Sequence, residues 1–325
     1  MKYAMVNGLD KQVSRMIYGC DWLSGKDEES KRIAFETLDN VYSLGCNAVD
    51  TAQIYSGGES ERVIGLWLQE RGIRENFVIL TKGAHHNRDR RRVTPYDILS
   101  DIHDSLARLK TSYIDIYILH RDDPDVEVGP IVEVLNKLHS EGKIRAFGGS
   151  NWTHRRIEAA NDYAAKHRLV PFTASSPNFG LADQVENPWG ELNVGISGAS
   201  QKEARDWYLA HRDVKIFAYS SLARGFFSGR IKPNTTAEEA KIILDAAAYK
   251  AYFHPVNLKK LARAEELAAK KGLTVPQIAA AYAMSHPLAI FSLQSPRGIE
   301  EMKQNVAAIN TELTAAEMAF LESGN

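Results

Sequence analysis

Short apolar runs alternate with longer amphipathic segments along most of the chain. The short runs are mostly rich in Val, Ile and aromatic side chains, which is typical of buried strands. The longer segments carry apolar residues at helical spacing, and several end at a glycine, the usual C-terminal cap of a helix. We expect strands at Arg15–Tyr18, Cys46–Asp50, Phe77–Thr81, Tyr113–Leu119, Ile144–Phe147, Phe172–Ser175, Lys215–Tyr219 and Ala289–Leu293. We expect helices at Glu28–Leu44, Glu59–Arg71, Thr94–Leu109, Gly129–Ser140, Thr153–Lys166, Ser200–His211, Leu258–Lys271, Val275–His286, Ile299–Ile309 and Ala315–Leu321.

The alternation predicts an α/β fold with a parallel sheet, because each strand is followed by at least one helix. Eight such units in 325 residues fit a closed (β/α)8 barrel, and we expect residues 1–325 to form this one domain. A hairpin should precede the barrel, from Tyr3–Val6 through a turn at Asn7-Gly8 to Val13–Ser14. The alternative is a doubly wound open sheet with a Gly-x-Gly-x-x-Gly turn after the first strand. The residues there, Gly-Cys-Asp-Trp-Leu-Ser, do not match that turn.

Two long segments interrupt the alternation, Asn178–Ala199 and Arg224–Asn257. We expect both to be insertions in loops that follow strands, on the side of the barrel where active sites form. Their aromatic residues Trp189, Phe226 and Phe227 are candidates for lining a pocket, although packing is the commoner role of such side chains.

Composition and charge narrow the function classes. The 40 basic and 41 acidic residues nearly cancel, which argues against a nucleic-acid-binding protein with a basic face. Cys20 and Cys46 do not make a disulfide framework, so a reducing compartment is expected. The first residues show no signal-peptide pattern and no apolar run has the length of a membrane span, so we expect a cytoplasmic protein. We expect its partner to be a small-molecule substrate.

One local charge cluster stands out, the basic run Arg88–Arg92. A solvated loop is the more common role of such a run. The alternative is a clamp on an anionic substrate.

Four chemically different side chains occur at the ends of successive expected strands or just beyond them. Asp50 ends the second strand, and Tyr55 follows in the next loop. Lys82 follows the third strand, and His120 follows the fourth. Because the carboxyl ends of parallel strands meet at one rim of a barrel, these groups should lie close together.

Such a set can donate a proton to a carbonyl oxygen. A phenol has an ordinary pKa of about 10 and is a poor acid near neutrality. We expect the ammonium of Lys82, held by Asp50, to lower the pKa of Tyr55, and His120 to donate a hydrogen bond to the oxyanion that develops. None of these groups supplies a hydride, so a cofactor must. Each side chain alone has a structural explanation, such as a buried Asp50–Lys82 ion pair, but the ordered set is more specific.

The motifs around these residues resemble the aldo-keto reductase family, from about Tyr18 to Asn305. Gly45–Glu61 is similar to the family signature around its catalytic aspartate and tyrosine. Later motifs follow in the family's order at Thr81-Lys82, Tyr113–His120, Gly142–Asn151 and Ala218–Gly225.

The resemblance implies a (β/α)8 barrel and hydride transfer from NADPH or NADH to an aldehyde or ketone. Tyr55 would be the proton donor, assisted by His120 and Lys82, with Asp50 supporting Lys82. The cofactor would contact Gly19, Cys20, Ser150, Asn151, Ser176, Tyr219, Ser220, Leu222, Arg224, Gly225, Ser295, Arg297, Glu301 and Asn305. The substrate would contact Trp22, Tyr55, His120, Arg121 and Trp189, and no metal ion is expected. The polar residues at the expected mouth favour a hydroxylated or sugar-like carbonyl compound.

Three departures from the family pattern concern the cofactor. Ser176 stands where the family usually has glutamine, with Asn178 as a candidate replacement, and Ser221 stands in place of a common proline. Glu301 puts an acid near the adenosine, where a 2′-hydroxyl is easier to accept than a 2′-phosphate. Arg297 is the nearest candidate partner for a phosphate. NADP(H) remains favoured as the usual family cofactor, and NAD(H) is a serious rival.

Two other functions remain open at this point. A cofactor-binding sensor or partner subunit could be built on the same barrel with little turnover. A metal-dependent barrel isomerase or hydrolase is suggested by His85-His86 and by the acidic residues Asp122, Asp123 and Asp125, although adjacent histidines rarely make a complete ligand set.

Overall fold

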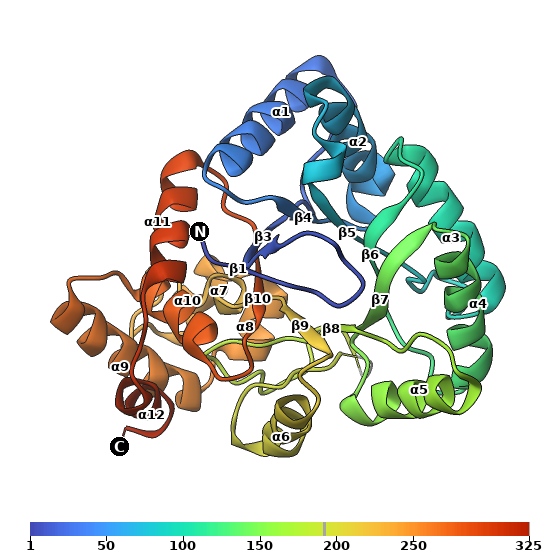
Figure 1. The fold of residues 1–325 in the computed structure, drawn as a ribbon. Coiled ribbons are helices and arrows are strands. Elements are labelled where there is room, and N and C mark those ends of the chain that lie inside the picture. The colour runs from blue at the N-terminus through green and yellow to red at the C-terminus, as the bar shows by residue number, and fades with distance from the viewer. Residues whose placement is uncertain (191–192, 325) are drawn as a thin grey trace.

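Eight parallel strands close into a barrel in the computed structural model, which describes residues 1–190 and 193–324 (Figure 1). The hydrogen-bonded order around the barrel is β10-β3-β4-β5-β6-β7-β8-β9, so the open-sheet alternative is wrong. The barrel strands are β3 (Met16–Gly19), β4 (Ala48–Asp50), β5 (Val78–Gly83), β6 (Ile114–Leu119), β7 (Ile144–Ser150), β8 (Ala174–Ser176), β9 (Lys215–Ala218) and β10 (Phe291–Gln294).

The parallel register places the C-terminal ends of neighbouring strands at the same height. Asp50 at the end of β4 pairs with Leu80 of β5, and Lys82 pairs with Ile118 of β6. Ser150 at the end of β7 pairs with Ser176 at the end of β8. Side chains that follow these ends therefore share one rim, as parallel strands require.

Helices surround the barrel (Figure 1). They begin where the sequence supplies N-caps: the side chains of Thr94 and Thr153, for example, accept hydrogen bonds from backbone N–H groups of the first turn. The longer helices are α1 (Glu28–Ser43), α2 (Glu59–Arg71), α3 (Pro95–Arg108), α4 (Val128–Ser140), α5 (His154–His167), α6 (Lys202–Ala210), α9 (Pro255–Lys271), α10 (Val275–Ser285), α11 (Ile299–Asn310) and α12 (Ala315–Ser323). Among the helices of the described residues, none combines the length and the hydropathy that crossing a membrane requires.

The apolar core has two layers, one inside the barrel and one between strands and helices. Inside the barrel, Phe217 and Phe291 stack with ring centroids 4.9 Å apart, and Ile116 and Ile118 pack in the same cluster. The interior is therefore a packed core rather than a channel.

An N-terminal hairpin closes the end of the barrel opposite to the rim formed by the C-terminal ends of the strands. Its strands β1 (Tyr3–Ala4) and β2 (Val13–Ser14) pair antiparallel, as expected. Apolar side chains of this segment pack into the interior cluster of the barrel. The fully buried carboxylate of Asp115 lies 3.2 Å from Lys11 of the hairpin and 2.9 Å from Arg74. This ion pair links the hairpin to strand β6.

Strand β7, the fifth strand of the barrel along the chain, is longer than expected. It does not stop at Phe147 but continues through Gly148 and Gly149 to Ser150. A Cβ on Gly148 would lie 1.6 Å from the carbonyl oxygen of Ala174 on β8. Gly148 is thus needed for the close approach of β7 to β8, and a Cβ on Gly149 would lie 2.4 Å from the ring of Trp152.

Two short helices, α7 (Ala237–Ile243) and α8 (Ala246–Tyr252), were not expected inside the second insertion. Thr236 and Glu239 form a capping box before α7, a signal that was present in the sequence. Phe226 and Phe227 of the same insertion are fully buried and pack against each other, so they do not line the pocket.

Substituting Gly148 by alanine tests the close approach of β7 and β8. We expect Gly148→Ala to lower the free energy of unfolding by about 3 kcal/mol or more, because the added methyl group forces the two strands apart. Urea unfolding measures this loss. The matched control is Gly298→Ala, where an added Cβ meets nothing within 4 Å, and its cost should stay below about 1 kcal/mol. Equal losses for the two variants would contradict this account of the glycines.

Candidate active site

A cavity of about 530 Å³ lies at the C-terminal rim of the barrel. It brings together the four groups expected to carry the chemistry, Asp50, Tyr55, Lys82 and His120. Expected cofactor contacts that also line it are Gly19, Ser150, Asn151, Ser176, Tyr219, Ser220, Leu222, Arg224, Gly225, Ser295, Glu301 and Asn305. Expected substrate contacts that line it are Tyr55, His120, Arg121 and Trp189.

The ammonium of Lys82 is the centre of the polar network. It donates hydrogen bonds to a carboxylate oxygen of Asp50, to the carbonyl oxygen of Thr51 at 3.0 Å and to the hydroxyl of Tyr55 at 3.3 Å. An ammonium has three donors, so all of them are used. Lys82 and Asp50 are buried, and their pairing holds the ammonium beside Tyr55.

Burial and pairing act in opposite directions on Lys82. Burial is the largest single influence and lowers the pKa of the Lys82 ammonium, but the charge and hydrogen bond of Asp50 together with those of Tyr55 outweigh it and raise the pKa above the ordinary value. Lys82 therefore stays charged at neutral pH, which is what a group that stabilises a phenolate requires.

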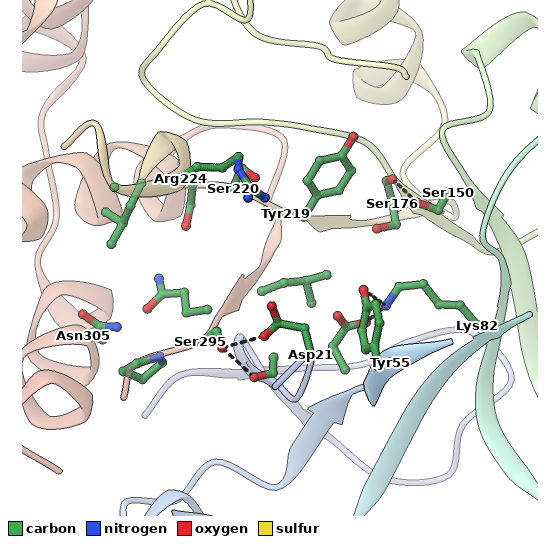
Figure 2. Close-up of a pocket in the computed structure, with 18 of the residues that line it drawn as sticks. Asp21, Tyr55, Lys82, Ser150, Ser176, Tyr219, Ser220, Arg224, Ser295 and Asn305 are labelled. Carbon is green, nitrogen blue, oxygen red and sulfur yellow. Dashed lines mark hydrogen bonds and ion pairs between the residues drawn. The ribbon is translucent and has the colours of Figure 1, made fainter. Parts of the chain in front are cut away.

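A tight turn places Tyr55. The turn is the 3-10 segment η1 (Tyr55–Gly58), in which Ser56 and Gly57 adopt left-handed backbone angles with φ of 49° and 66°. The hydroxyl of Tyr55 accepts a hydrogen bond from Lys82, so its own proton is free to point into the cavity. In Figure 2, Tyr55 and Lys82 lie together across the opening from Tyr219 and Ser176.

Lys82 lowers the pKa of Tyr55 as expected, but burial has the larger effect and the net shift is upward. Burial raises the pKa of the Tyr55 phenol above its ordinary value, and the positive charge of Lys82 opposes this rise without reversing it. The phenol is thus held protonated, and the ammonium limits the rise. The sequence pairs the two groups but does not tell how deeply they are buried.

His120 is a neutral imidazole beside the phenol. Its ring centroid lies 5.7 Å from that of Tyr55 in an edge arrangement. Burial lowers the pKa of His120 well below its usual range, and the charge of Lys82 lowers it further. A neutral imidazole offers one N–H donor and one acceptor nitrogen. Its Nδ1 is buried and has no hydrogen-bond partner among residues 1–190 and 193–324.

Amide and hydroxyl groups gather opposite the phenol. The hydroxyl of Tyr219 donates to Asn151 Oδ1 at 2.8 Å, and Ser150 Oγ donates to the carbonyl oxygen of Ser176 at 2.9 Å. The Ser176 hydroxyl is buried and unpaired within the described part of the chain. Asn178 instead donates to the Tyr252 hydroxyl at 2.8 Å and does not line the cavity, so it does not replace the missing glutamine.

This polar group can bind a planar carboxamide. Ser150, Asn151 and Ser176 offer hydroxyl and amide hydrogen-bonding groups at the cavity wall, and Ser176 has a spare buried hydroxyl. A carboxamide needs both donors and acceptors, which these side chains supply. The residues present therefore fit a nicotinamide.

The far end of the cavity contains residues that the sequence did not point out. Ser295 Oγ lies within hydrogen-bond distance of the carbonyl oxygen of Gly19, at 2.8 Å, and of Asp21 Oδ1, at 3.0 Å (Figure 2). Other lining residues that were not expected are Ser221, Ser228, Arg230, Leu293, Gln294 and Pro296. Leu293 and Gln294 end strand β10 and Asp21 follows a strand end, a signal that could have been used, whereas the positions of the others depend on loop conformation.

Three of the expected contacts do not line this cavity. Cys20 is fully buried behind the rim. The guanidinium of Arg297 lies 4.5 Å above the ring of Trp22, and both lie outside the lining. Glu301 does line the cavity, and its carboxylate accepts a hydrogen bond from the backbone N–H of Arg297 at 2.9 Å.

Ion pairs account for the charged loops. Arg90, Arg91 and Arg92 pair with acidic side chains at 2.7, 2.8 and 2.6 Å respectively. Asp122 pairs with Arg156 at 3.2 Å. The basic run is thus mostly compensated, and its arginines do not line the cavity. Over residues 1–190 and 193–324, no group of three or more His, Cys, Asp or Glu side chains is arranged to hold a metal ion.

The sequence model of the aldo/keto reductase family matches residues 15–325. The chain belongs to the aldo/keto reductase family. As a member of this family, it is an oxidoreductase that uses NADPH or NADH.

Curated relatives share about a quarter of their residues with this family member. It is 27% identical to an aryl-alcohol dehydrogenase of Pestalotiopsis microspora over 95% of this chain and 77% of the relative. It is 26% identical to an aldo-keto reductase of Bacillus subtilis over 94% of this chain and 88% of the relative.

Solved structures share the fold. A glycerol dehydrogenase from Gluconobacter oxydans matches with a TM-score of 0.77 and 23% identity, over 99% of this chain and 96% of that one. An aldo-keto reductase from Klebsiella pneumoniae, crystallised with NADPH, matches with a TM-score of 0.71 and 24% identity, over 99% of this chain and 95% of that one.

The raised pKa of Tyr55 leads to a pH prediction. A group that acts in its protonated form and has a raised pKa is active below its ordinary pKa and loses activity above it. We expect kcat/KM for carbonyl reduction to stay level between about pH 6 and 9 and to fall above the ordinary phenol value of about 10. Initial rates in buffers of constant ionic strength measure the profile. A fall centred near neutrality would contradict the raised pKa.

Proposed function

We propose that this protein reduces an aldehyde or ketone to an alcohol, with Tyr55 as the proton donor. The observation that supports this most is the hydrogen bond from the charged Lys82 to the Tyr55 hydroxyl. That bond leaves the proton of the phenol facing the cavity, next to a neutral His120.

The substrate carbonyl oxygen would lie between Tyr55 and His120. His120 would donate a hydrogen bond to this oxygen and orient it. When bound, the nicotinamide supplies the hydride that forms the new C–H bond at the carbonyl carbon. Tyr55 would then transfer its proton to the oxygen, and the phenolate left behind would be stabilised by Lys82.

Asp50 has a supporting role in this scheme. Its carboxylate keeps Lys82 charged in a buried place, where an unpaired ammonium would lose its proton. A buried phenolate beside a charged ammonium costs far less than an isolated one. The network therefore favours the step in which Tyr55 becomes negative.

The cofactor would be held along the length of the cavity. We assign the nicotinamide end to Ser150, Asn151, Ser176 and Tyr219, and the pyrophosphate region to Ser220, Leu222, Arg224 and Gly225. We assign the adenosine end to Ser295, Glu301 and Asn305. All of these side chains or backbones line one continuous cavity.

NADP(H) is the favoured cofactor, with NAD(H) as the rival. Two relatives support NADP(H). One structural neighbour was crystallised with NADPH, and a 26% identical relative from Phanerodontia chrysosporium is an NADP(+)-linked aryl-alcohol dehydrogenase. Against it stands Glu301 at the adenosine end. The hydrogen bond that its carboxylate accepts from Arg297 draws part of that charge away from a phosphate.

Replacing Tyr55 tests the proton donor. We expect Tyr55→Phe to lower kcat by about 100-fold or more, since general acid catalysis contributes about this much. Cofactor affinity, measured by quenching of tryptophan fluorescence, should stay within about threefold because the hydroxyl is not assigned to the cofactor. The control is Tyr96→Phe on the exposed surface, which should behave as wild type. A Tyr55→Phe variant that keeps more than a tenth of kcat would rule out this role.

Replacing Glu301 tests the cofactor choice. We expect the wild-type protein to bind NADPH more tightly than NADH in a fluorescence titration. Glu301→Gln should increase the affinity for NADPH by about fivefold and leave NADH nearly unchanged, because it removes a negative charge near the extra phosphate. The matched control is Glu300→Gln, where the carboxylate pairs with Lys303 at 2.7 Å. Tighter binding of NADH by the wild type would overturn the preference.

A further inference from the structure

Arg121 is a charged side chain in the cavity that the proton-transfer scheme does not use. It follows His120 directly in the chain, is half-buried and lines the cavity together with Tyr55 and Tyr219. Its backbone carbonyl accepts a hydrogen bond from Trp152 Nε1 at 3.2 Å, which fixes the start of the loop. The backbone of Arg121 is therefore held in place, and its side chain lines the cavity near the reacting groups.

Neighbouring arginines form ion pairs, whereas Arg121 forms none with the described residues. Arg91, Arg92 and Arg156 each form an ion pair with an aspartate at 2.6 to 3.2 Å. Within residues 1–190 and 193–324, the side chain of Arg121 makes neither an ion pair nor a hydrogen bond with any residue. An arginine keeps its charge near neutrality even when burial lowers its pKa, because the ordinary value is above about 12.

Among the residues that the structure describes, no acidic side chain lining the cavity forms an ion pair with Arg121. The carboxylate of Asp50 is taken by Lys82. The remaining acids that line the cavity are Asp21 and Glu301. Asp21 Oδ1 lies 3.0 Å from Ser295 Oγ, and Glu301 accepts a hydrogen bond from the backbone N–H of Arg297, so each has a partner other than Arg121. Among the described residues, the Arg121 guanidinium thus lines the cavity without a paired acid, and an unpaired positive charge attracts an anion.

Two histidines make the same region rich in hydrogen-bonding groups. The ring of His85 packs edge-on against His120 with centroids 4.8 Å apart. Both ring nitrogens of His86 are buried and have no partner in the described part of the chain. Burial lowers the pKa of both His85 and His86, so both rings are neutral, and the charge in this region comes from Arg121.

We propose that Arg121 binds a carboxylate carried by the substrate, so that the preferred substrates are aldehydes or ketones that also bear a carboxylate. A guanidinium is planar and presents paired N–H donors that match the two oxygens of a carboxylate. A neutral hydroxylated or sugar-like carbonyl compound would leave this half-buried charge without a partner. The inference rests on the proposed function, since it places the substrate carbonyl at Tyr55.

Matched pairs of aldehydes test the inference. The acids are 4-carboxybenzaldehyde and 4-oxobutanoate, and their neutral partners are the methyl esters of the same two compounds. The readout is the ratio of kcat/KM for acid over ester, measured with the favoured nicotinamide cofactor. For at least one pair we expect a ratio of about 10 to 100 in the wild type, the worth of a charge-assisted hydrogen bond. The ratio should shrink as ionic strength rises.

Three variants assign this preference to one side chain. Arg121→Gln should bring the ratio close to one, and Arg121→Lys should keep an intermediate value, because it retains the charge but loses the planar pair of donors. The control is Arg88→Gln, an exposed residue of the basic run that lies outside the cavity, and it should keep the wild-type ratio. A wild-type ratio near one for both pairs would overturn the inference, as would a ratio that Arg121→Gln leaves unchanged.

A binding measurement separates this failure from failure of the proposed function. Calorimetric titration of the NADPH-bound protein with 4-(hydroxymethyl)benzoate and with its methyl ester needs no turnover. If no aldehyde is reduced, the proposed function fails, and the titration still decides the inference. Tighter binding of the acid that disappears in Arg121→Gln supports it, and equal binding of acid and ester overturns it.

Discussion

A buried ammonium is the constraint on which the rest of the site depends. Lys82 is almost fully inside the barrel, and a charge in such a place is tolerated only if every donor has a partner. The protein provides three acceptors, from the end of β4, the backbone after it and the Tyr55 hydroxyl. The register of β4 with β5 and the tight turn of η1 are both needed to bring them there.

In this arrangement, two effects act in opposite directions on the pKa of the Tyr55 phenol. Burial raises the pKa of Tyr55, and the neighbouring charge of Lys82 limits that rise. A phenol with these properties holds its proton in the resting protein and releases it when negative charge appears on a nearby oxygen. In the proposed reaction, such a phenol suits reduction at neutral pH, whereas oxidation of an alcohol would need the phenolate first.

Much of the fold and of the candidate site could be predicted from the sequence. The strands, the barrel and the common rim of Asp50, Tyr55, Lys82 and His120 follow from apolar periodicity and from the topology of parallel strands. The features that the sequence did not predict depend on how deeply side chains are buried and on loop conformation. The direction of the Tyr55 shift requires the degree of burial, and the position of Trp22 under Arg297 depends on how two loops meet. The end of β7 was expected three residues too early, at Phe147, because glycine is common both beyond strand ends and at close contacts between strands.

Strand β6 carries Asp115 near its beginning, and His120 follows its end. Five residues of extended chain separate them by roughly 16 Å. Asp115 anchors the hairpin at the closed end of the barrel, while His120 belongs to the open end. Substitutions that far apart and without shared partners add nearly independently. The loops around the open end can therefore be exchanged to suit new ligands while the anchor below keeps the barrel intact.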